Sequence, residues 1–454
     1  MEADDEKREA VVAAFKHAWG AYARDAMGYD EYHPIKGRGS NFSAKGGIGY
    51  TVVDAIDTMS EYEVARHWIE TELSFNHSGS MVSTFETTIR VLGGLLSARY
   101  LTSDALFLKH AEDLGHRLVV AFNTSPAEAG SLQLEFKYLA ELTQNETFWH
   151  KAEHVIAVMR KGLLPSGLAP TSMNVMFGTF QSSLVRLGSS ADSYYEYLAQ
   201  YLQTNMTEPI YQTMYDHAMD GIAENLMQQT PEENLTYMGE LNPLGRPLAN
   251  DGTMSTWNFG NRQEHLVCFL AGSLMLGARL RDWKMGIDFL EGCLSTHDTL
   301  TGLAPEVAQF RAAEDVDYPY SRDWFIPGRM RNTKNDKWAP YEAQYMLRPE
   351  IVESLFIAWR LTGDLRYRDW AWNIFSSIEK HARIPTGGYA TVSDVDQIPV
   401  KLVDKQETFF LSETLKYLYL TFCESNVLPL QDIVFNTEAH PFPLFNPTIK
   451  AEFV

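Results

Sequence analysis

The strongest constraint on the fold of this chain is a motif that occurs three times. Residues 101–111 (LTSDALFLKHA), 142–152 (LTQNETFWHKA) and 361–371 (LTGDLRYRDWA) share Leu-Thr, then Asp or Asn three residues after the Leu, and a final Ala. The Asp or Asn favours a helix start, because its side chain can accept a hydrogen bond from a free backbone N–H. Each copy therefore predicts a helical hairpin, and stacked hairpins form a solenoid or close into a ring.

Helical periodicity extends this prediction along the chain. Apolar residues recur at i, i+3 and i+4 in segments 8–26, 85–101, 265–280, 351–363 and 407–422. Extended patterns are few, and the clearest is residues 384–395, where Gly387-Gly388 predicts the turn of a short hairpin. Residues 312–347 are expected to form a long loop, because the helical pattern resumes unchanged after them.

Composition and charge narrow the class of protein. With 45% hydrophobic and 12% aromatic residues in 454, the chain can bury a large core. A net charge of −21 argues against nucleic acid and anionic membranes as partners.

The most apolar stretch, 266–278, has 13 residues, fewer than the roughly 20 that span a bilayer. Three cysteines are too few for a disulfide scaffold, and spacing alone leaves open whether Cys268 pairs with Cys293.

The N-terminal residues and the N-glycosylation sequons indicate in which cellular compartment the chain is expected. The first residues, MEADDEKRE, are unlike a basic-then-apolar leader, so we expect either a cytosolic chain or one whose leader has been removed. Asn-x-Ser/Thr sequons favour the second alternative, and they begin at Asn41, Asn76, Asn123, Asn145, Asn205 and Asn234. Unused surface asparagines are the other interpretation, and helix capping explains Asn145 equally well.

Acidic residues on apolar helix faces are the first candidates for function, because burying an unpaired charge costs several kcal/mol. Glu86 and Arg90 lie four residues apart within the apolar FETTIRVLGGLL. A simple ion pair on the helix face is the alternative interpretation. Asp192 and Glu196 form a like-charge pair at the same spacing, which destabilises a free helix. Capping by Asp192 is the alternative there.

The C-terminal half adds further candidates. Glu350 falls in the first turn of a predicted helix, where the helix dipole favours the ionised form that a general base requires. Glu353 lies one turn further on, and Glu413 sits between leucines, with an ion pair to Lys416 as the alternative. His265 alone is more often a hydrogen-bonded core histidine than a catalyst.

Motifs of other chemistries are missing from the sequence: there is no Walker motif, GxGxxG after a strand, HExxH, CxxC pair or GxSxG. A helical ring with inward carboxylates and many aromatic residues remains. That combination suits glycoside hydrolysis, in which two carboxyl groups flank the bond to be cleaved.

These motifs resemble, in order and over nearly the whole chain, those of the class I α-1,2-mannosidases of glycoside hydrolase family 47. The resemblance is carried by segments such as AFKHAWGAYARDAMGYDE (14–31), FETTIRVLGGLLSARYL (85–101), ADSYYEYL (191–198), LRPEIVESLF (347–356) and VFNTEAHPFPLF (434–445). It implies an all-α (αα)7 barrel of stacked hairpins with a short β-hairpin and a C-terminal plug, as a single catalytic domain over 1–454. It also implies a calcium-dependent, inverting hydrolase that removes terminal α-1,2-linked mannose from high-mannose N-glycans.

Position by position, the resemblance assigns roles. It implies that Glu86 is the general acid, acting through a water, that Glu350 is the general base and that Asp192 is a third essential carboxylate. The residues that it implies line the mannose subsite are Arg90, His265, Arg348, Glu353, Phe409, Glu413 and Glu438.

The resemblance further implies a metal site, a disulfide and two departures. Thr437, on the segment that plugs the barrel floor, would bind Ca²⁺, and Cys268 would pair with Cys293. Ser190 stands where enzymes of the endoplasmic reticulum that prefer a single mannose carry Arg, and residues 122–127 replace a longer loop. Both departures concern specificity, because neither changes the carboxylates.

The implied partners are high-mannose N-glycans on glycoproteins, with no nucleic acid and no transmembrane segment in this chain. A monomer in the lumen of the endoplasmic reticulum or Golgi, or a secreted protein, is expected. One alternative is a catalytically weak relative that binds mannose-rich glycans in glycoprotein quality control. Another is a barrel enzyme of different specificity, such as a lyase or glucan hydrolase, which a floor without calcium would favour.

Overall fold

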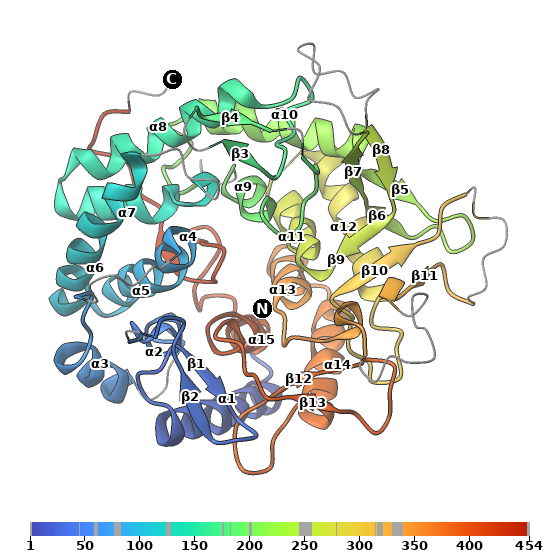
Figure 1. The fold of residues 1–454 in the computed structure, drawn as a ribbon, viewed down its shortest axis with the longest axis horizontal. Coiled ribbons are helices and arrows are strands. Elements are labelled where there is room, and N and C mark those ends of the chain that lie inside the picture. The colour runs from blue at the N-terminus through green and yellow to red at the C-terminus, as the bar shows by residue number, and fades with distance from the viewer. Residues whose placement is uncertain are drawn as a thin grey trace.

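The computed structural model describes residues 2–44, 46–58, 62–76, 83–123, 129–174, 177–181, 183–198, 202–244, 257–277, 279–313, 315, 321–328 and 339–451. Its helices form an inner and an outer ring, between which the chain alternates (Figure 1). The outer helices are α1 (Asp5–Asp25), α3 (Tyr62–Thr71), α6 (Ala105–Leu118), α8 (Glu146–Gly162), α10 (Pro209–Asn225), α12 (Leu280–Ser295) and α14 (Leu365–His381). The inner helices are α2 (Tyr50–Asp54), α4 (Thr84–Glu86) with α5 (Gly93–Thr102), α7 (Gln133–Thr143), α9 (Asp192–Tyr197), α11 (Phe269–Leu276), α13 (Glu350–Thr362) and α15 (Leu415–Phe422).

The predicted helical hairpins are confirmed at all three copies of the motif. Asp104, Asn145 and Asp364 cap α6, α8 and α14, and their side chains accept backbone N–H groups at 2.9, 3.1 and 3.0 Å. The residue before each cap ends the preceding inner helix with a positive φ, namely 61° at Ser103, 55° at Gln144 and 71° at Gly363. Only Gly363 adopts that conformation without a steric cost. Asn145 is therefore a cap, whatever else its sequon does.

Burial separates the two rings. In α13 every residue from Glu350 to Trp359 is buried, because outer helices cover one side and the contents of the barrel the other. In the outer α14, buried residues recur at helical spacing, as in an amphipathic surface helix. The buried apolar side chains form a core cluster that extends from Val11 to Ile449.

Short strands lie in the segments that connect the helices. They are β1 (Glu31–His33), β2 (Arg38–Ser40), β3 (Met173–Asn174), β4 (Thr179–Phe180), β5 (Met227–Gln229), β6 (Thr236–Met238), β7 (Glu240–Pro243), β8 (Trp257–Gly260), β9 (Arg262–Glu264), β10 (Val307–Phe310), β11 (Trp324–Phe325), β12 (Thr391–Val392), β13 (Leu402–Val403), β14 (Ile433–Phe435) and β15 (Pro441–Pro443). β10 is the centre of an antiparallel three-stranded sheet between β9 and β11, and the others form antiparallel pairs.

The predicted hairpin within 384–395 is only partly right. Gly387 and Gly388, with φ of 127° and 84°, do form a tight turn, but it closes a single bridge between Arg383 and Tyr389. Beyond it the chain pairs elsewhere, since β12 lies against the later strand β13. The predicted loop 312–347 contains β11 and lies partly outside the described residues, as does the short loop 122–127.

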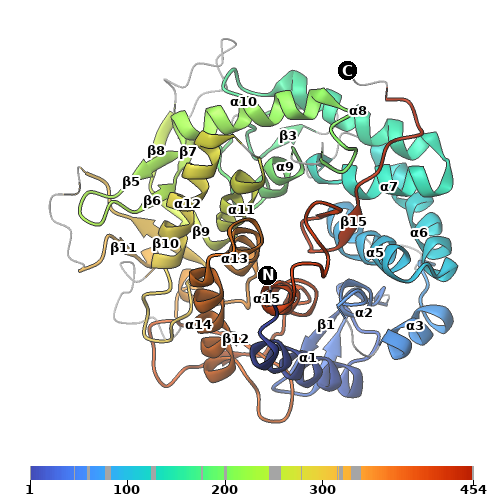
Figure 2. The ribbon, with the colours of Figure 1, turned by 180° about the vertical axis from the view of Figure 1, so that it is seen from behind.

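The C-terminal segment enters the ring from one side and turns back out (Figure 2). Strands β14 and β15 pair around residues 436–440, which lie at the centre. Phe435 packs its ring 5.8 Å from Phe356 and 5.6 Å from Tyr417, while the buried Phe442 lies 5.5 Å from Tyr138. Aromatic anchors on inner helices therefore hold this segment, as the predicted plug requires.

A disulfide between Cys268 and Cys293 joins the start of α11 to the outer α12, which confirms the expected pairing. Cys423 is free and buried. None of the helices in the described part of the chain combines the length and apolar character needed to cross a bilayer.

Candidate active site

A cavity of about 360 Å³ lies where the N-terminal ends of inner helices converge on the plug. The predicted site residues that line it are Glu86, Arg90, Asp192, Arg348, Glu350, Glu353, Phe409, Glu413, Thr437 and Glu438. His265 is buried directly behind this wall, in the short helix η6 (His265–Cys268). Residues distant in sequence are thus gathered around one space, which ordinary helix-face ion pairs do not explain.

Glu350 is the best-supported carboxylate of the site. It is the first residue of α13, as predicted, and its Oε2 lies 2.7 Å from Nδ1 of His265. Arg348, oriented by Glu306 at 3.1 Å, has its Nη1 3.6 Å from Oε1 of Glu350. Burial acts to raise the pKa of Glu350, but the His265 hydrogen bond and the Arg348 charge outweigh it and lower the pKa. This carboxylate is therefore held ionised, as a proton acceptor must be.

Arg90 joins Glu86 to the floor. Its Nε lies 2.6 Å from Oε2 of Glu86, while one Nη donates to Thr408 at 2.9 Å and to Glu438 at 2.8 Å. The ion pair between Glu86 and Arg90, given above as the alternative interpretation, is present. Both of its side chains line the cavity, so it is not a simple ion pair on a helix surface. Arg90 thereby orients Glu86, whose side chain is 43% exposed.

Phe409 provides an aromatic surface between the two arginines. The guanidinium carbons of Arg90 and Arg348 lie 5.7 and 5.3 Å from its ring centroid. Both distances fall within the range of cation–π attraction. The two cations therefore hold this ring in place in the cavity wall.

Two π-helical turns aim side chains into the cavity. They are η1 (Thr87–Leu92), which carries Arg90, and η9 (Phe410–Thr414), which carries Glu413. Such turns widen a helix locally and recur at functional sites. The alternative pairing of Glu413 with Lys416 is wrong, because Nζ of Lys416 points away from the cavity to Asp57 and to the carbonyl of Ala439, 2.7 Å from each.

Five other carboxyl groups of the cavity differ from Glu350, because their pKa values are raised. Burial, together with neighbouring carboxylates, raises the pKa of Asp192 to about 7 and that of Glu196 to about 8. For the same reasons the pKa values of Glu353 and Glu413 lie well above normal. Glu438 reaches a pKa of about 8 despite the Arg90 charge. The cavity thus contains more acidic groups than its own cations neutralise.

Sequence comparison decides the family. The family model for glycosyl hydrolase family 47 matches residues 14–126 and 123–444. This chain belongs to glycosyl hydrolase family 47. The family 47 chain is 36% identical to mannosyl-oligosaccharide 1,2-alpha-mannosidase MNS3 of Arabidopsis thaliana, over 96% of its own length and 79% of that protein.

Two further comparisons agree. The endoplasmic reticulum mannosyl-oligosaccharide 1,2-alpha-mannosidase of Homo sapiens is 37% identical, over 97% of this chain and 64% of that protein. An alpha-1,2-mannosidase from Trichoderma reesei has a similar structure, with a TM-score of 0.86 and 26% identity over 98% of this chain and 100% of that one. The predicted family, the glycoside hydrolase class and the all-α barrel are confirmed.

The donor chemistry of the family 47 cavity fits a hard cation. Thr437 is half-buried at its floor and donates a hydrogen bond to Glu196. Over the described ranges, no cluster of three or more His, Cys, Asp or Glu side chains has the geometry of metal ligands. Oxygen from Thr437, from water and from a bound ligand would therefore have to complete a metal site here. The excess of buried carboxylates is the observation that favours a positive ion.

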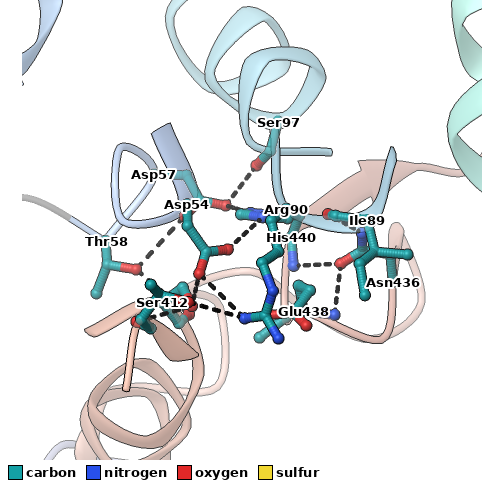
Figure 3. A network of polar contacts seen from close by, with 12 residues as sticks. Asp54, Asp57, Thr58, Ile89, Arg90, Ser97, Ser412, Asn436, Glu438 and His440 are labelled. Atoms are coloured by element: carbon teal, nitrogen blue, oxygen red, sulfur yellow. Dashed lines mark hydrogen bonds and ion pairs between the residues drawn. The ribbon is translucent and has the colours of Figure 1, made fainter. Parts of the chain in front are cut away.

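Beneath the floor of the family 47 barrel lies a polar network that the sequence did not predict (Figure 3). His440 places Nδ1 2.8 Å from Asp57 and Nε2 3.3 Å from Asp54, and Asp54 lies 3.4 Å from Arg90. Although burial lowers it, the pKa of His440 is raised to about 9 by these carboxylates. The pKa values of both aspartates are lowered despite burial, because His440, Lys416 and Arg90 neutralise them.

Asn436 fixes the turn of the plug. Its Oδ1 accepts the N–H groups of Glu438 at 3.0 Å and His440 at 2.9 Å. Its Nδ2 donates to the carbonyl of Ile89 at 2.9 Å and to Glu135 at 2.7 Å. All four hydrogen bonds of one buried amide are thus used to present Thr437 and Glu438 to the cavity.

Three carboxylates at or beneath the site were missed or undervalued in the sequence. Asp54 and Asp57 lie in VVDAIDTM, where their spacing alone predicts nothing. Glu196 lines the cavity, and its like-charge spacing from Asp192 was the available signal. Ser190, exposed and with a φ of 77°, also borders the cavity, so the departure noted there faces the substrate side.

Proposed function

We propose that this protein is a calcium-dependent, inverting α-1,2-mannosidase that removes terminal α-1,2-linked mannose from high-mannose N-glycans of glycoproteins. The observation that carries the proposal is a buried but ionised Glu350, held by His265 and Arg348 on the wall of a cavity that Glu86 also lines. The names of the relatives give the substrate and the linkage. All residues from 1 to 454 are proposed to form one catalytic unit.

Inversion needs two carboxyl groups on opposite sides of the scissile bond. Glu350 accepts a proton from a water molecule while the water oxygen bonds to the anomeric carbon. The bond from that carbon to the leaving oxygen breaks, and the leaving oxygen receives a proton from the side of Glu86 through a second water. His265 and Arg348 stabilise Glu350 as the base, and Asp192 is the third essential carboxylate.

The subsite residues orient the sugar. Phe409 offers a flat apolar surface for one face of the ring, while Glu353, Glu413 and Glu438 accept hydrogen bonds from hydroxyl groups. Ca²⁺, held by Thr437 through oxygen, would supply positive charge that binds sugar hydroxyls and favours a distorted ring. The raised pKa values of the surrounding carboxylates support this assignment, because a cation would offset their mutual repulsion.

The setting follows from the substrate. N-glycans are carried by glycoproteins of the secretory route, so we propose a lumenal or secreted monomer. Several relatives are named as endoplasmic reticulum enzymes. Ser190 places a neutral side chain on the cavity wall where enzymes that prefer a single mannose carry an arginine, and we expect the order of trimming to differ accordingly.

The test measures mannose release from a nine-mannose N-glycan, with calcium and after chelation. We expect release only with calcium, and a loss of about 10²- to 10⁴-fold in Glu350→Gln, the range for a general acid or base. Asp369→Asn, on the exposed side of α14, is the matched control and should keep full activity. Proton NMR of the first product should show the inverted β-anomer. Glycan binding without release in the unmodified protein would instead favour the non-hydrolytic relative.

A further inference from the structure

A second cavity, of about 540 Å³, adjoins the first. Glu86 and Arg90 line both spaces, so one pair of side chains forms the wall between them. The second cavity also borders Thr84, at the start of α4, so both spaces lie at the N-terminal end of that inner helix. Its volume falls within the usual range for ligand sites. None of the roles given above uses it.

Phe42, Ser43, Gly46 and Ile48 line one side of this second cavity, and Phe42 presents an aromatic ring there. Carboxylate oxygens of the buried Asp30 accept the backbone N–H groups of Phe42 at 3.1 Å and of Ile48 at 2.9 Å. Gly47 packs so closely that a Cβ there would lie 2.3 Å from Oδ1 of Asn41. With its backbone held in this way, Phe42 still leaves 59% of its surface exposed. One edge contact holds this ring, whose centroid lies 5.1 Å from that of Tyr50, and the exposed remainder is available as a contact surface.

The cations that the structure describes in the lining of this cavity are each paired with a carboxylate. Lys405 lies 3.1 Å from both Glu31 and Glu407, and Arg90 and Arg117 lie 2.6 and 3.1 Å from carboxylates of their own helices. Because these described cations already have carboxylate partners, they offer little attraction to an anion. Hydroxyl, guanidinium and carboxylate groups beside an exposed aromatic ring suit a neutral, hydroxyl-rich ligand, which hydrogen-bonds at its edges and stacks on one face.

We infer that this second cavity is a glycan subsite that holds an uncleaved mannose branch while the terminal mannose occupies the first cavity. The inference rests on the proposed function. A branched oligosaccharide with one arm at Glu350 must place its other arms somewhere beside that cavity, and the shared wall of Glu86 and Arg90 makes this space contiguous with it. Phe42 is the stacking surface of the subsite, and Lys405 with Glu407 forms its polar edge.

The experiment compares two substrates of different size. α-1,2-mannobiose can fill only the first cavity, whereas the nine-mannose glycan can fill both. Phe42→Ala should lower kcat/KM about three- to tenfold for the glycan, mainly through KM, and leave the disaccharide unchanged. Phe42→Trp keeps an aromatic face and should restore the value for the glycan. Leu365→Ala, which removes a 63% exposed apolar side chain from α14, is the matched control and should affect neither substrate.

An equal fall for both substrates, or no change for the glycan, would overturn the subsite. If the unmodified protein releases mannose from neither substrate, the proposed function fails, and the subsite is then judged by binding alone. Calorimetric titration of the nine-mannose glycan into Glu350→Gln and into the Glu350→Gln, Phe42→Ala double variant decides that case. Weaker binding to the double variant supports the subsite, and equal binding contradicts it.

Discussion

Two groups of buried carboxylates flank the same C-terminal turn, and their electrostatics are opposite. Beneath the turn, Asp54 and Asp57 share the cations Arg90, Lys416 and His440, and their pKa values are lowered. Above it, Glu196, Glu353 and Glu413 face the cavity with few cations, and their pKa values are raised. Both groups consist of buried carboxylic acids, so the presence of neighbouring cations is what separates them.

The difference indicates which group serves stability and which serves chemistry. Removing one partner from a buried ion pair leaves an uncompensated charge, so paired carboxylates contribute to holding the plug. Crowded carboxylates with few cationic partners destabilise the fold, and such groups concentrate at functional sites. The side of the plug that faces the paired carboxylates therefore serves stability. The side that faces the cavity serves the proposed chemistry.

The largest expected effect comes from breaking the lower group. Asp57→Asn leaves Lys416 and His440 without their shared carboxylate, and we expect the free energy of unfolding to fall by about 3 to 5 kcal/mol. Urea unfolding monitored by tryptophan fluorescence measures it. Glu353→Gln is the matched variant from the upper group. It should change stability by less than about 1 kcal/mol in calcium-free buffer, because burial and neighbouring carboxylates raise the pKa of Glu353 and so favour its neutral form, which Gln resembles. Similar losses in both variants would contradict the comparison.

The next largest effect is expected on the stability of the folded state when Ca²⁺ is removed. If Thr437 binds Ca²⁺, calcium at about 100 times its dissociation constant should add about 2.7 kcal/mol to the stability of the folded state. Chelation should then lower Tm in a scan of the unmodified protein. Thr437→Val keeps the side-chain shape but removes the hydroxyl, and its Tm should respond much less to calcium. An equal calcium response in Thr437→Val would remove this residue from the site.

The smallest effect is the pH dependence of the lower group. His440 titrates near pH 6.5 when unfolded and at about pH 9 when folded. Its contribution is therefore complete below about pH 6.5 and declines as the pH rises towards 9, by at most about 1.4 kcal/mol per pH unit. Denaturant unfolding at pH 7 and pH 8 should show this decline, and His440→Gln should show a shallower one. Identical slopes would mean that His440 is neutral in the folded protein.

Much of the ring was predictable because its signals are local. Asp104, Asn145 and Asp364 cap helices through hydrogen bonds that span two residues, so a short motif is enough to reveal them. The acidic residues on apolar faces were recognisable for a similar reason, since helical spacing alone shows which side of a helix they occupy. The turn at Gly387-Gly388 was also local, but the partner strand of β12 was not.

The amino-acid sequence by itself thus determined the helical hairpins, the family and the carboxylates that deserve a role. Only the tertiary structure decided which carboxylates are neutralised, which face the cavity through π-helical turns, and where Lys416 and His440 find partners. The bonds from Asp57 to these two residues span 359 and 383 positions of the chain. Charge compensation depends on distances of a few ångströms in space, and no periodicity in the sequence records contacts between residues so far apart.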